Sequence, residues 1–384
     1  MQNVSSTQNT CKTSCLKQFF LHPRVPAAAF FLVFWLVASL LGPVCLQAAA
    51  GQADESAQGA GQIKAFVYHH FGMQDKYPST SVSLEQFQDH LDYLKTHDYK
   101  VLTLGEALER LYSAQELPKR TAVITIDDGY SSIWDQALPL LEEYGYPASI
   151  FVATSHVGGK GYLSWEELKK LHEKGFEIGN HSHSHAYFLD LEQGELEEAF
   201  AADLKKSHAE FERHLGSVPD LYAYPYGEYT PEMMSILEDQ GYLAAAAQHS
   251  GVISSLSRGF ALPRFPMNLN YANMEGFREK LGMNALQVTE AVPESPLVSG
   301  ENPPRLKLRI ENQELNPDEL QCFVSGQRDC SLDTVSKDDA LELEVQATSE
   351  LSARRTLYTI TGPSKDGSKW FWHSQLWVIP GVPE

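Results

Sequence analysis

The stretch AVITIDDG at residues 122–129 decides much of the fold. Its apolar and β-branched residues are typical of a buried strand, and Asp127 and Asp128 follow at once. A second stretch, FEIGNHSHSH at residues 176–185, has the same order, with a short strand pattern followed by histidines. Because α/β folds build active sites at the carboxyl ends of their strands, the two stretches predict one shared site.

Strand and helix patterns alternate on both sides of these stretches. The strand patterns lie at residues 63–68, 101–104, 122–126, 148–153, 176–179, 221–224 and 243–247. Helical patterns, some opened by capping-box residues, separate most of them. Repeated strand–helix units predict a parallel sheet, and about seven of them favour a barrel over an open sheet.

The pattern changes after Ala285. Residues 291–304 are rich in proline and read as a linker, and residues 305–384 alternate with the period of a strand. We therefore predict a small C-terminal antiparallel β-sandwich domain of unknown role. Its aromatic residues fit either a sandwich core, which we favour, or a platform for sugar rings: Trp370, Phe371, Trp372 and Trp377.

The N-terminus has the order of a signal peptide within residues 1–50. Basic residues precede an apolar stretch at residues 27–41, and QAAA at residues 47–50 offers a cleavage site. This predicts export to the periplasm or the cell exterior, with an uncleaved membrane anchor as the alternative and peripheral association with the cell envelope allowed. Residues 51–61 are small and polar and read as a flexible leader.

The net charge bears on which molecules the protein can bind, and the cysteine content bears on whether it forms a disulfide. Removing residues 1–50 leaves 27 basic and 50 acidic residues, a net charge of −23. Such acidity argues against a nucleic-acid partner, and nothing in the sequence indicates a protein partner. Of the five cysteines, Cys322 and Cys330 remain after cleavage. We predict that they form a disulfide, because export permits it and a metal site would need more ligands.

The histidines and aspartates have the composition of a metal site. His181 and His185, with an aspartate from another strand, make a set that zinc accepts while leaving a position open for water. Two surface histidines are the alternative for this pair. Asp127 and Asp128 are adjacent at a strand end, so their side chains point in different directions and can take separate roles. A simple turn is the alternative for Asp-Asp-Gly.

These motifs resemble those of the polysaccharide deacetylases with a NodB-like domain, carbohydrate esterase family four. The family motif T-F-D-D-G appears as TIDDG at residues 125–129, and H-[ST]-x-x-H appears within HSHSH at residues 181–185. A third motif, R-x-P-Y, is matched in part by AYPYG at residues 223–227. The resemblance places the deacetylase domain at residues 62–290 and implies a distorted (β/α)₇ barrel.

The resemblance also implies roles for individual residues. Asp128, His181 and His185 would hold one divalent metal ion, zinc or alternatively nickel, cobalt or iron. Asp127 would be the general base, and Tyr226 would offer its backbone N–H to the oxyanion.

The sequence departs from the family pattern at two places. Ala223 replaces the arginine of the third motif, as in the biofilm-type deacetylases of poly-β-1,6-N-acetylglucosamine, and Arg264 is a candidate to replace it from another strand. The motif that supplies the general acid is not evident. His249 is a candidate for it, with a loop histidine as the alternative, and His69 is either a residue behind the ligands or a core histidine.

Together these features predict an exported, metal-dependent N-deacetylase of an N-acetylated polysaccharide, with poly-N-acetylglucosamine as the first choice. Peptidoglycan, chitin oligomers and acetyl xylan are the alternative substrates. A non-catalytic carbohydrate-binding protein on a degenerate deacetylase fold remains open, and so does another metal hydrolase such as a phosphoesterase.

Overall fold

The computed structural model describes residues 61–383, apart from 114, 269, 312–313, 328–329 and 338–339. The predicted signal peptide at residues 1–50 and nearly all of the leader predicted at residues 51–61 lie outside the described residues. Within the described part of the chain, no helix is long and apolar enough to cross a membrane.

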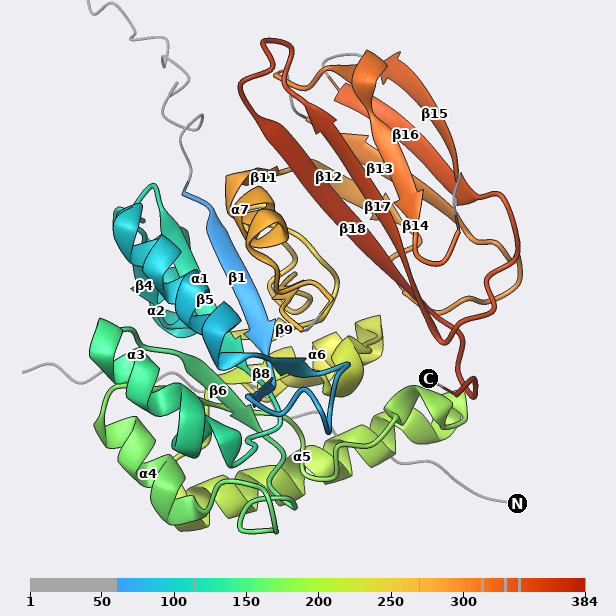
Figure 1. Ribbon diagram of the computed structural model, residues 1–384. Coiled ribbons are helices and arrows are strands. Elements are labelled where there is room, and N and C mark those ends of the chain that lie inside the picture. Colours follow the sequence, from blue (N-terminus) through green and yellow to red (C-terminus); the bar gives the residue numbers. More distant parts are fainter. Residues whose placement is uncertain are drawn as a thin grey trace, which may run out of the picture. The chain divides into compact units, whose positions relative to one another are not determined.

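One parallel sheet of eight strands carries the first part of the chain (Figure 1). The strand order is β10-β1-β5-β6-β7-β8-β9. β4 and β6 pair with the same edge of β5, β4 with its first residues and β6 with its last. The strands are β1 (Ile63–Tyr68), β4 (Lys100–Leu102), β5 (Thr121–Ile126), β6 (Ser149–Val152), β7 (Glu177–Asn180), β8 (Leu221–Ala223), β9 (Ala244–Ala246) and β10 (Phe265–Pro266).

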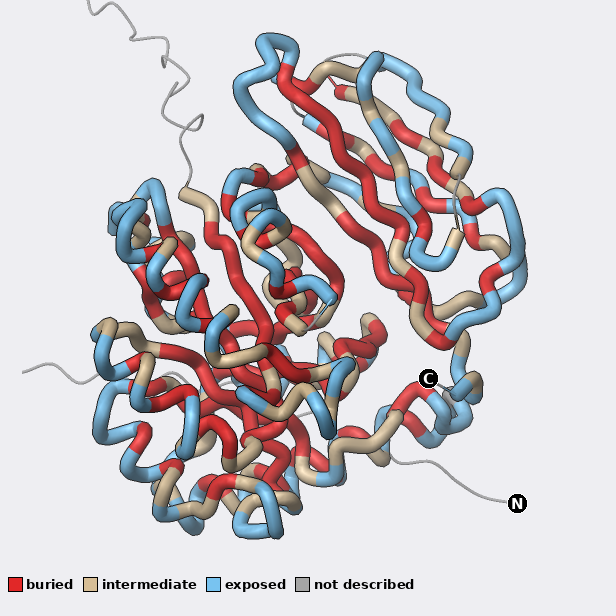
Figure 2. Tube along the Cα trace, viewed as in Figure 1, coloured by how far each residue is buried: buried red, intermediate tan, exposed pale blue. Residues whose placement is uncertain are grey.

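The central strands are buried on both faces. Every residue of β1, β5 and β6 is buried, which explains their nearly continuous apolar sequences. Figure 2 shows this burial along the strands, with the exposed residues mainly on the helices and loops around them. The predicted parallel sheet is therefore confirmed.

The sheet curls as a half-barrel, which is consistent with a barrel of the NodB-like kind, and the distorted (β/α)₇ form stays a prediction. Among the described residues no ladder joins the end strands β9 and β10 directly. The segment before β10 links them instead, because Leu262 accepts from the backbone N–H of Ala247 and donates to the carbonyl of Ala245, both at 2.9 Å. Arg264, two residues on, lies where this segment meets β10.

Helices α1, α3, α4 and α5 flank the strands (Figure 1). The predicted capping boxes are present at α1 and α4, where Ser83 pairs with Gln86 and Ser164 with Glu167. The helices are α1 (Leu84–Thr96), α2 (Leu104–Tyr112), a π-turn (Ile133–Ala137) leading into α3 (Leu138–Tyr144), α4 (Trp165–Glu173), α5 (Gln193–Leu215), α6 (Pro231–Asp239) and α7 (Met274–Gly282). Short elements are β2 (His70–Phe71), β3 (Ser81–Val82) and the 3₁₀ turns η3 (Phe188–Asp190), η4 (Pro225–Gly227) and η5 (Pro317–Glu319).

The C-terminal strands form two four-stranded sheets, β11-β18-β17-β14 and β12-β13-β16-β15. All pairs are antiparallel except β11 with β18. Both sheets contribute to one buried apolar cluster, which supports the sandwich, although the sandwich itself stays a prediction. The strands are β11 (Met283–Ala285), β12 (Val288–Val292), β13 (Arg305–Ile310), β14 (Gln321–Val324), β15 (Cys330–Lys337), β16 (Ala340–Ala347), β17 (Arg355–Pro363) and β18 (Trp370–Val378).

Side chains in these sheets bear on two predictions from the sequence, the disulfide and the role of the aromatic residues. A disulfide joins Cys322 in β14 to Cys330 in β15, and so links one sheet to the other. Phe371 and Trp377 are buried in the core, whereas Trp370 is 39% exposed. The buried pair therefore packs the core, as the sequence favoured.

Residues 56–384 form one compact unit. β11, which precedes the predicted linker, and β12, which ends at its second residue, already belong to the C-terminal sheets. The boundaries predicted at residues 62–290, 291–304 and 305–384 therefore stay predictions, and the C-terminal sheets draw on residues before 291.

We predict that Gly179→Ala lowers the free energy of unfolding by about 1–3 kcal/mol, the usual cost of overpacking a core. A Cβ at this position of β7 would lie 2.3 Å from the ring of Phe151, which is completely buried. Thermal and denaturant unfolding measure the change. Gly194→Ala in α5 is the matched control, because its Cβ would have no neighbour within 4 Å. Equal stability of the two variants would contradict the packing described here.

Candidate active site

The two polar stretches singled out in the sequence come together at one edge of the sheet. β5 ends at Ile126 and is followed by Asp127 and Asp128, and β7 ends at Asn180 and is followed by His181. Because both strands run parallel with β6 between them, their carboxyl ends meet at the same edge.

The backbone at these strand ends is unusual. Asp128, Ser182 and His185 have φ values of 70°, 74° and 54°, the left-handed region that non-glycine residues rarely adopt. Each such residue costs on the order of 1–3 kcal/mol and needs support from its surroundings. Part of that support comes from Asp203 of α5, which is buried and accepts the backbone N–H of His183 at 2.6 Å. The Ser182 hydroxyl accepts the N–H of His185 at 2.8 Å.

Asp128, His181 and His185 form a compact cluster of ligand atoms. Oδ1 of Asp128 lies 3.3 Å from Nε2 of His181 and 3.0 Å from Nε2 of His185. The three offered ligand atoms all lie within 4.8 Å of one another, so one cation can contact them together. One carboxylate and two imidazoles are ligands that zinc and similar divalent ions accept, and three protein ligands leave an open position.

The surroundings of His181 suit it to metal binding. Its Nδ1 lies 2.7 Å from the carbonyl oxygen of Ala223, which can only accept, so Nδ1 donates and Nε2 faces Asp128. Burial opposes a charged imidazole, but the hydrogen bond to Asp128 and the nearby Asp127 raise the pKa of His181. Because Nδ1 is bound to the Ala223 carbonyl, Nε2 is the nitrogen that can face a metal, and the donor set fits a divalent ion.

Asp127 is not a member of this cluster and binds Arg264. Nη1 of Arg264 donates to Oδ1 of Asp127 at 2.7 Å and Nη2 donates to Oδ2 at 2.8 Å. Arg264 also donates to the hydroxyl of Thr125 at 3.1 Å and to the carbonyl of Ala247 at 2.9 Å. Both members of the ion pair are completely buried. Arg264 thus contacts Asp127, as a replacement for the arginine of the third motif would, and that role stays a prediction.

This pairing sets the protonation of Asp127. Burial alone would raise the pKa of its carboxyl group, but the Arg264 guanidinium and then His181 hold that pKa below its ordinary value. Asp127 is therefore a carboxylate at neutral pH. Asp128 is ionised for a related reason: burial opposes its charge, but hydrogen bonds from His181 and His185 hold its pKa well below the ordinary value.

The cluster opens into a cavity of about 470 Å³. Asp127 has no exposed surface and lies behind the cavity wall, where Nε2 of Gln248 is 3.5 Å from its Oδ2. The cavity is lined by all three members of the cluster and by residues from distant parts of the chain, among them His69, Tyr130, His156, Tyr162, Tyr226, Gln248 and Arg355.

Two further predicted residues, His69 and Tyr226, line this cavity. Burial lowers the pKa of His69, although Asp128 and Asp127 oppose that shift. Tyr226 lies in η4 with a φ of 59°, so its peptide is held in a strained conformation at the cavity.

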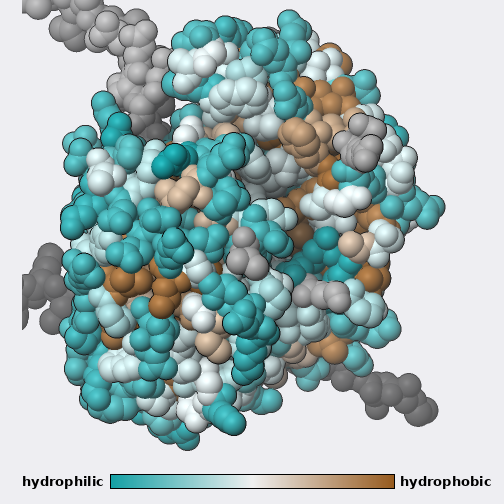
Figure 3. Space-filling view, viewed as in Figure 1, coloured by the Kyte–Doolittle hydropathy of each residue, from teal (hydrophilic) through white to brown (hydrophobic). Residues whose placement is uncertain are grey.

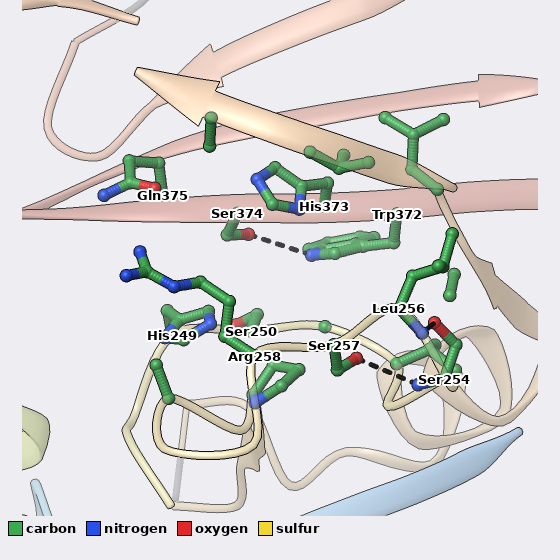
Figure 4. A pocket seen from close by; sticks show the side chains of 18 of the residues that line it. His249, Ser250, Ser254, Leu256, Ser257, Arg258, Trp372, His373, Ser374 and Gln375 are labelled. Atoms are coloured by element: carbon green, nitrogen blue, oxygen red, sulfur yellow. Dashed lines mark hydrogen bonds between the residues drawn. The ribbon is translucent and has the colours of Figure 1, made fainter. Parts of the chain in front are cut away.

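His249 is not brought to the cluster. It lies on the wall of a different cavity of about 240 Å³ (Figure 4). In Figure 4, His249 and Arg258 lie on one side of that cavity, and Trp372 and His373 of β18 lie on the other. Burial lowers the pKa of His249 to about 3, so its imidazole is neutral. The loop interpretation of this histidine, which the sequence left open, agrees with its position.

Sequence reasoning missed several residues of the cavity. Gln248 directly precedes His249, so a wider reading of that loop would have included it. Tyr130 follows the Asp-Asp-Gly motif by one residue and was within reach for the same reason. No sequence pattern indicated Arg355, which is the first residue of β17 and lies 170 positions after His185 in the sequence.

Comparisons with known proteins agree with this geometry. The family model described as polysaccharide deacetylase matches residues 114–245. The chain contains a polysaccharide deacetylase domain. The poly-beta-1,6-N-acetyl-D-glucosamine N-deacetylase of Staphylococcus aureus is 28% identical over 234 residues, which cover 57% of this chain and 80% of that protein. The deacetylase domain makes this protein a hydrolase of that family, as the motifs indicated.

Solved structures support the fold of the deacetylase domain. The deacetylase PplD of Streptococcus pyogenes has a TM-score of 0.52 at 19% identity, and the match covers 57% of this chain and 98% of that one. IcaB from Ammonifex degensii has a TM-score of 0.50 at 25% identity, covering 58% of this chain and 97% of that one. The matched share corresponds in size to the β/α part of the chain alone.

We predict that His185→Ala weakens zinc binding at least about 100-fold, because it removes one of three ligands. Competition titration against a chromophoric chelator measures the affinity. His183→Ala is the matched control: this histidine lies in the same loop, but its Nδ1 contacts the Thr154 hydroxyl at 2.9 Å and it is outside the cluster. The same zinc affinity for both variants would rule out the Asp128, His181 and His185 site.

Proposed function

We propose that this protein is an exported, metal-dependent N-deacetylase that hydrolyses the acetamide groups of a poly-N-acetylglucosamine exopolysaccharide. The family fixes only the class of hydrolase. The substrate is proposed because the Staphylococcus aureus relative is named for poly-beta-1,6-N-acetyl-D-glucosamine. The AYPYG sequence at residues 223–227, which resembles that of biofilm-type deacetylases, gives independent support.

The observation that carries the proposal is the second carboxylate, Asp127, held ionised by Arg264 beside the metal-binding cluster. A protein that only bound a metal or a sugar would have no need for this buried ion pair. Amide hydrolysis does need a carboxylate that takes a proton from the attacking water. The pair therefore favours an enzyme over a degenerate binding protein.

The proposed chemistry assigns one task to each group. Asp128, His181 and His185 hold a divalent ion, proposed to be zinc with nickel, cobalt or iron as alternatives. When bound, this ion polarises the acetamide carbonyl and lowers the pKa of a water molecule. Asp127 accepts the proton of the attacking water. Its enclosed position does not oppose this role, since catalytic hydrogen bonds often tighten only when substrate is bound.

Two further residues are assigned to the oxyanion and to the leaving amine of the acetamide. We assign the stabilisation of the developing oxyanion to the backbone N–H of Tyr226, which lines the cavity. His69 replaces His249 as the candidate that protonates the leaving amine. It lines the cavity and interacts electrostatically with both Asp127 and Asp128, whereas His249 faces the other cavity.

The acidity of the protein suits a product that carries positive charge. The full chain has 50 acidic and 30 basic residues, and the face drawn in Figure 3 is mainly hydrophilic. Deacetylation turns a neutral acetamide into an amine that is cationic at neutral pH. An acidic surface attracts such a partly deacetylated polymer, although acidity also serves solubility alone.

Deacetylation of defined substrates tests the proposal. We predict that the purified 51–384 protein, reloaded with zinc after chelation, releases acetate from β-1,6-linked N-acetylglucosamine oligomers. Asp127→Asn should lower kcat at least about 100-fold, because it removes the general base. The matched control is Asp89→Asn, an exposed aspartate of α1 far from the cavity, which should leave kcat unchanged.

The same assay separates the alternatives. Faster release from peptidoglycan, chitin oligomers or acetyl xylan would keep the enzyme class and change the substrate. No release from any of these substrates with zinc, nickel, cobalt or iron would contradict the proposal and favour a carbohydrate-binding protein. Hydrolysis of a generic phosphate ester instead would favour the phosphoesterase.

A further inference from the structure

Two consecutive arginines of the C-terminal sheets reach the loops of the deacetylase cavity. Arg354 lies directly before β17, and Arg355 is the first residue of that strand. Both contact residues that precede α6 in the chain, more than 120 positions away. The C-terminal region therefore touches the site itself.

Arg354 holds the loop that follows η4. It is only 4% exposed, and its Nε and Nη2 donate to the two carboxylate oxygens of Glu228 at 2.7 and 2.8 Å. Its Nη1 donates to Asp190 at 2.7 Å. Glu228 is 3% exposed, so this is a bidentate ion pair inside the protein. Such a pair fixes the relative orientation of the two side chains, because neither buried charge can exchange its partner for water.

Aromatic stacking continues the contact toward the cavity. The guanidinium of Arg354 lies 4.1 Å from the ring centroid of Tyr187. Tyr187 in turn stacks on Tyr226, with centroids 3.7 Å apart and planes at 7°. Arg354, Tyr187 and Tyr226 thus form a column that ends at the cavity wall.

Arg355 also contacts Tyr226. Its Nη1 donates to the main-chain oxygen of Tyr226, and Arg355 itself lines the cavity of the metal-binding cluster. Tyr226 has a φ of 59°, and Gly227 after it has a φ of 73°. A strained peptide of this kind persists only where its surroundings determine it fully.

We propose that the C-terminal strands are a working part of the active site, with Arg355 as a positioning residue that holds the Tyr226 carbonyl and so fixes the backbone dihedrals that orient the Tyr226 N–H. This inference rests on the proposed role of the Tyr226 N–H in the reaction. Arg354 supports the same loop through Glu228 and Tyr187. The role differs from that of a separate sugar-binding module, because it acts through the backbone geometry of the deacetylase site.

Arg355 is the position to test. Arg354→Ala would remove the bidentate partner of the buried Glu228 carboxylate, so that variant puts the fold at risk. Arg355 is half-buried, so its replacement puts the fold at less risk. Arg278→Ala is the matched control, because Arg278 also lies over a tyrosine, Tyr93, at 5.3 Å but in α7 away from the cavity.

We predict that Arg355→Ala lowers kcat about 10- to 100-fold with KM within about threefold, since a misplaced donor weakens transition-state contacts more than substrate binding. Arg355→Lys should recover part of the loss, because a lysine can still donate to the Tyr226 carbonyl. Arg278→Ala should keep the wild-type kcat. Hydrogen exchange of the peptide covering residues 224–230 should be at least about tenfold faster in Arg355→Ala than in the wild type.

Unchanged kcat and unchanged exchange in Arg355→Ala would overturn the inference and leave the proposed function intact. An increase in KM alone would also overturn it, because it would make Arg355 a binding contact. If the wild type releases no acetate, the proposed function fails, and the exchange measurement still decides whether Arg355 holds the Tyr226 peptide. Equal melting temperatures of Arg355→Ala and Arg278→Ala show that the comparison is between folded proteins.

Discussion

The buried ion pair between Asp127 and Arg264 is the constraint on which the rest of the site depends. Two charges without exposed surface persist only with each other and with further hydrogen bonds, which Thr125 and Ala247 supply. Through these contacts Arg264 joins the end of β5 to the end of β9, across the opening of the half-barrel. The pair thus fixes the end of β5, which is followed by Asp128 of the cluster, relative to the end of β9.

The same region contains strained backbone conformations that contacts from other elements stabilise. Asp128, His185 and Tyr226 all adopt left-handed backbone conformations at the cavity. Asp203 supports the histidine loop from α5, and Arg355 supports the Tyr226 peptide from β17. The histidine loop and the Tyr226 segment therefore each have a supporting neighbour from a distant element, as expected where backbone strain is part of a functional site. A polar loop alone could not hold these side chains in place.

The sequence predicted the main strands of the parallel sheet because those depend on local patterns, and the family resemblance pointed to the three residues that the structure brings together. The apolar run before Asp127 and the H-x-x-x-H spacing of His181 and His185 are visible without coordinates. The contact of Arg264 with Asp127 was only one candidate, since 137 positions separate the two residues. The second cavity around His249 and the reach of Arg355 were not predictable. Both follow from how the C-terminal sheets lie against the β/α part, and no periodicity encodes that.

A double-mutant cycle with Asp127→Asn and Arg264→Met tests the central claim most directly. At pH 7 each single change strands a buried group and should cost about 3–5 kcal/mol of unfolding free energy. The double variant should cost at least about 2 kcal/mol less than the sum. Because Arg264 lowers the pKa of Asp127 in the folded protein, this coupling should be complete above about pH 5 and disappear as the pH falls through that pKa, below about 4. Additive effects, within about 0.5 kcal/mol at pH 7, would contradict the account.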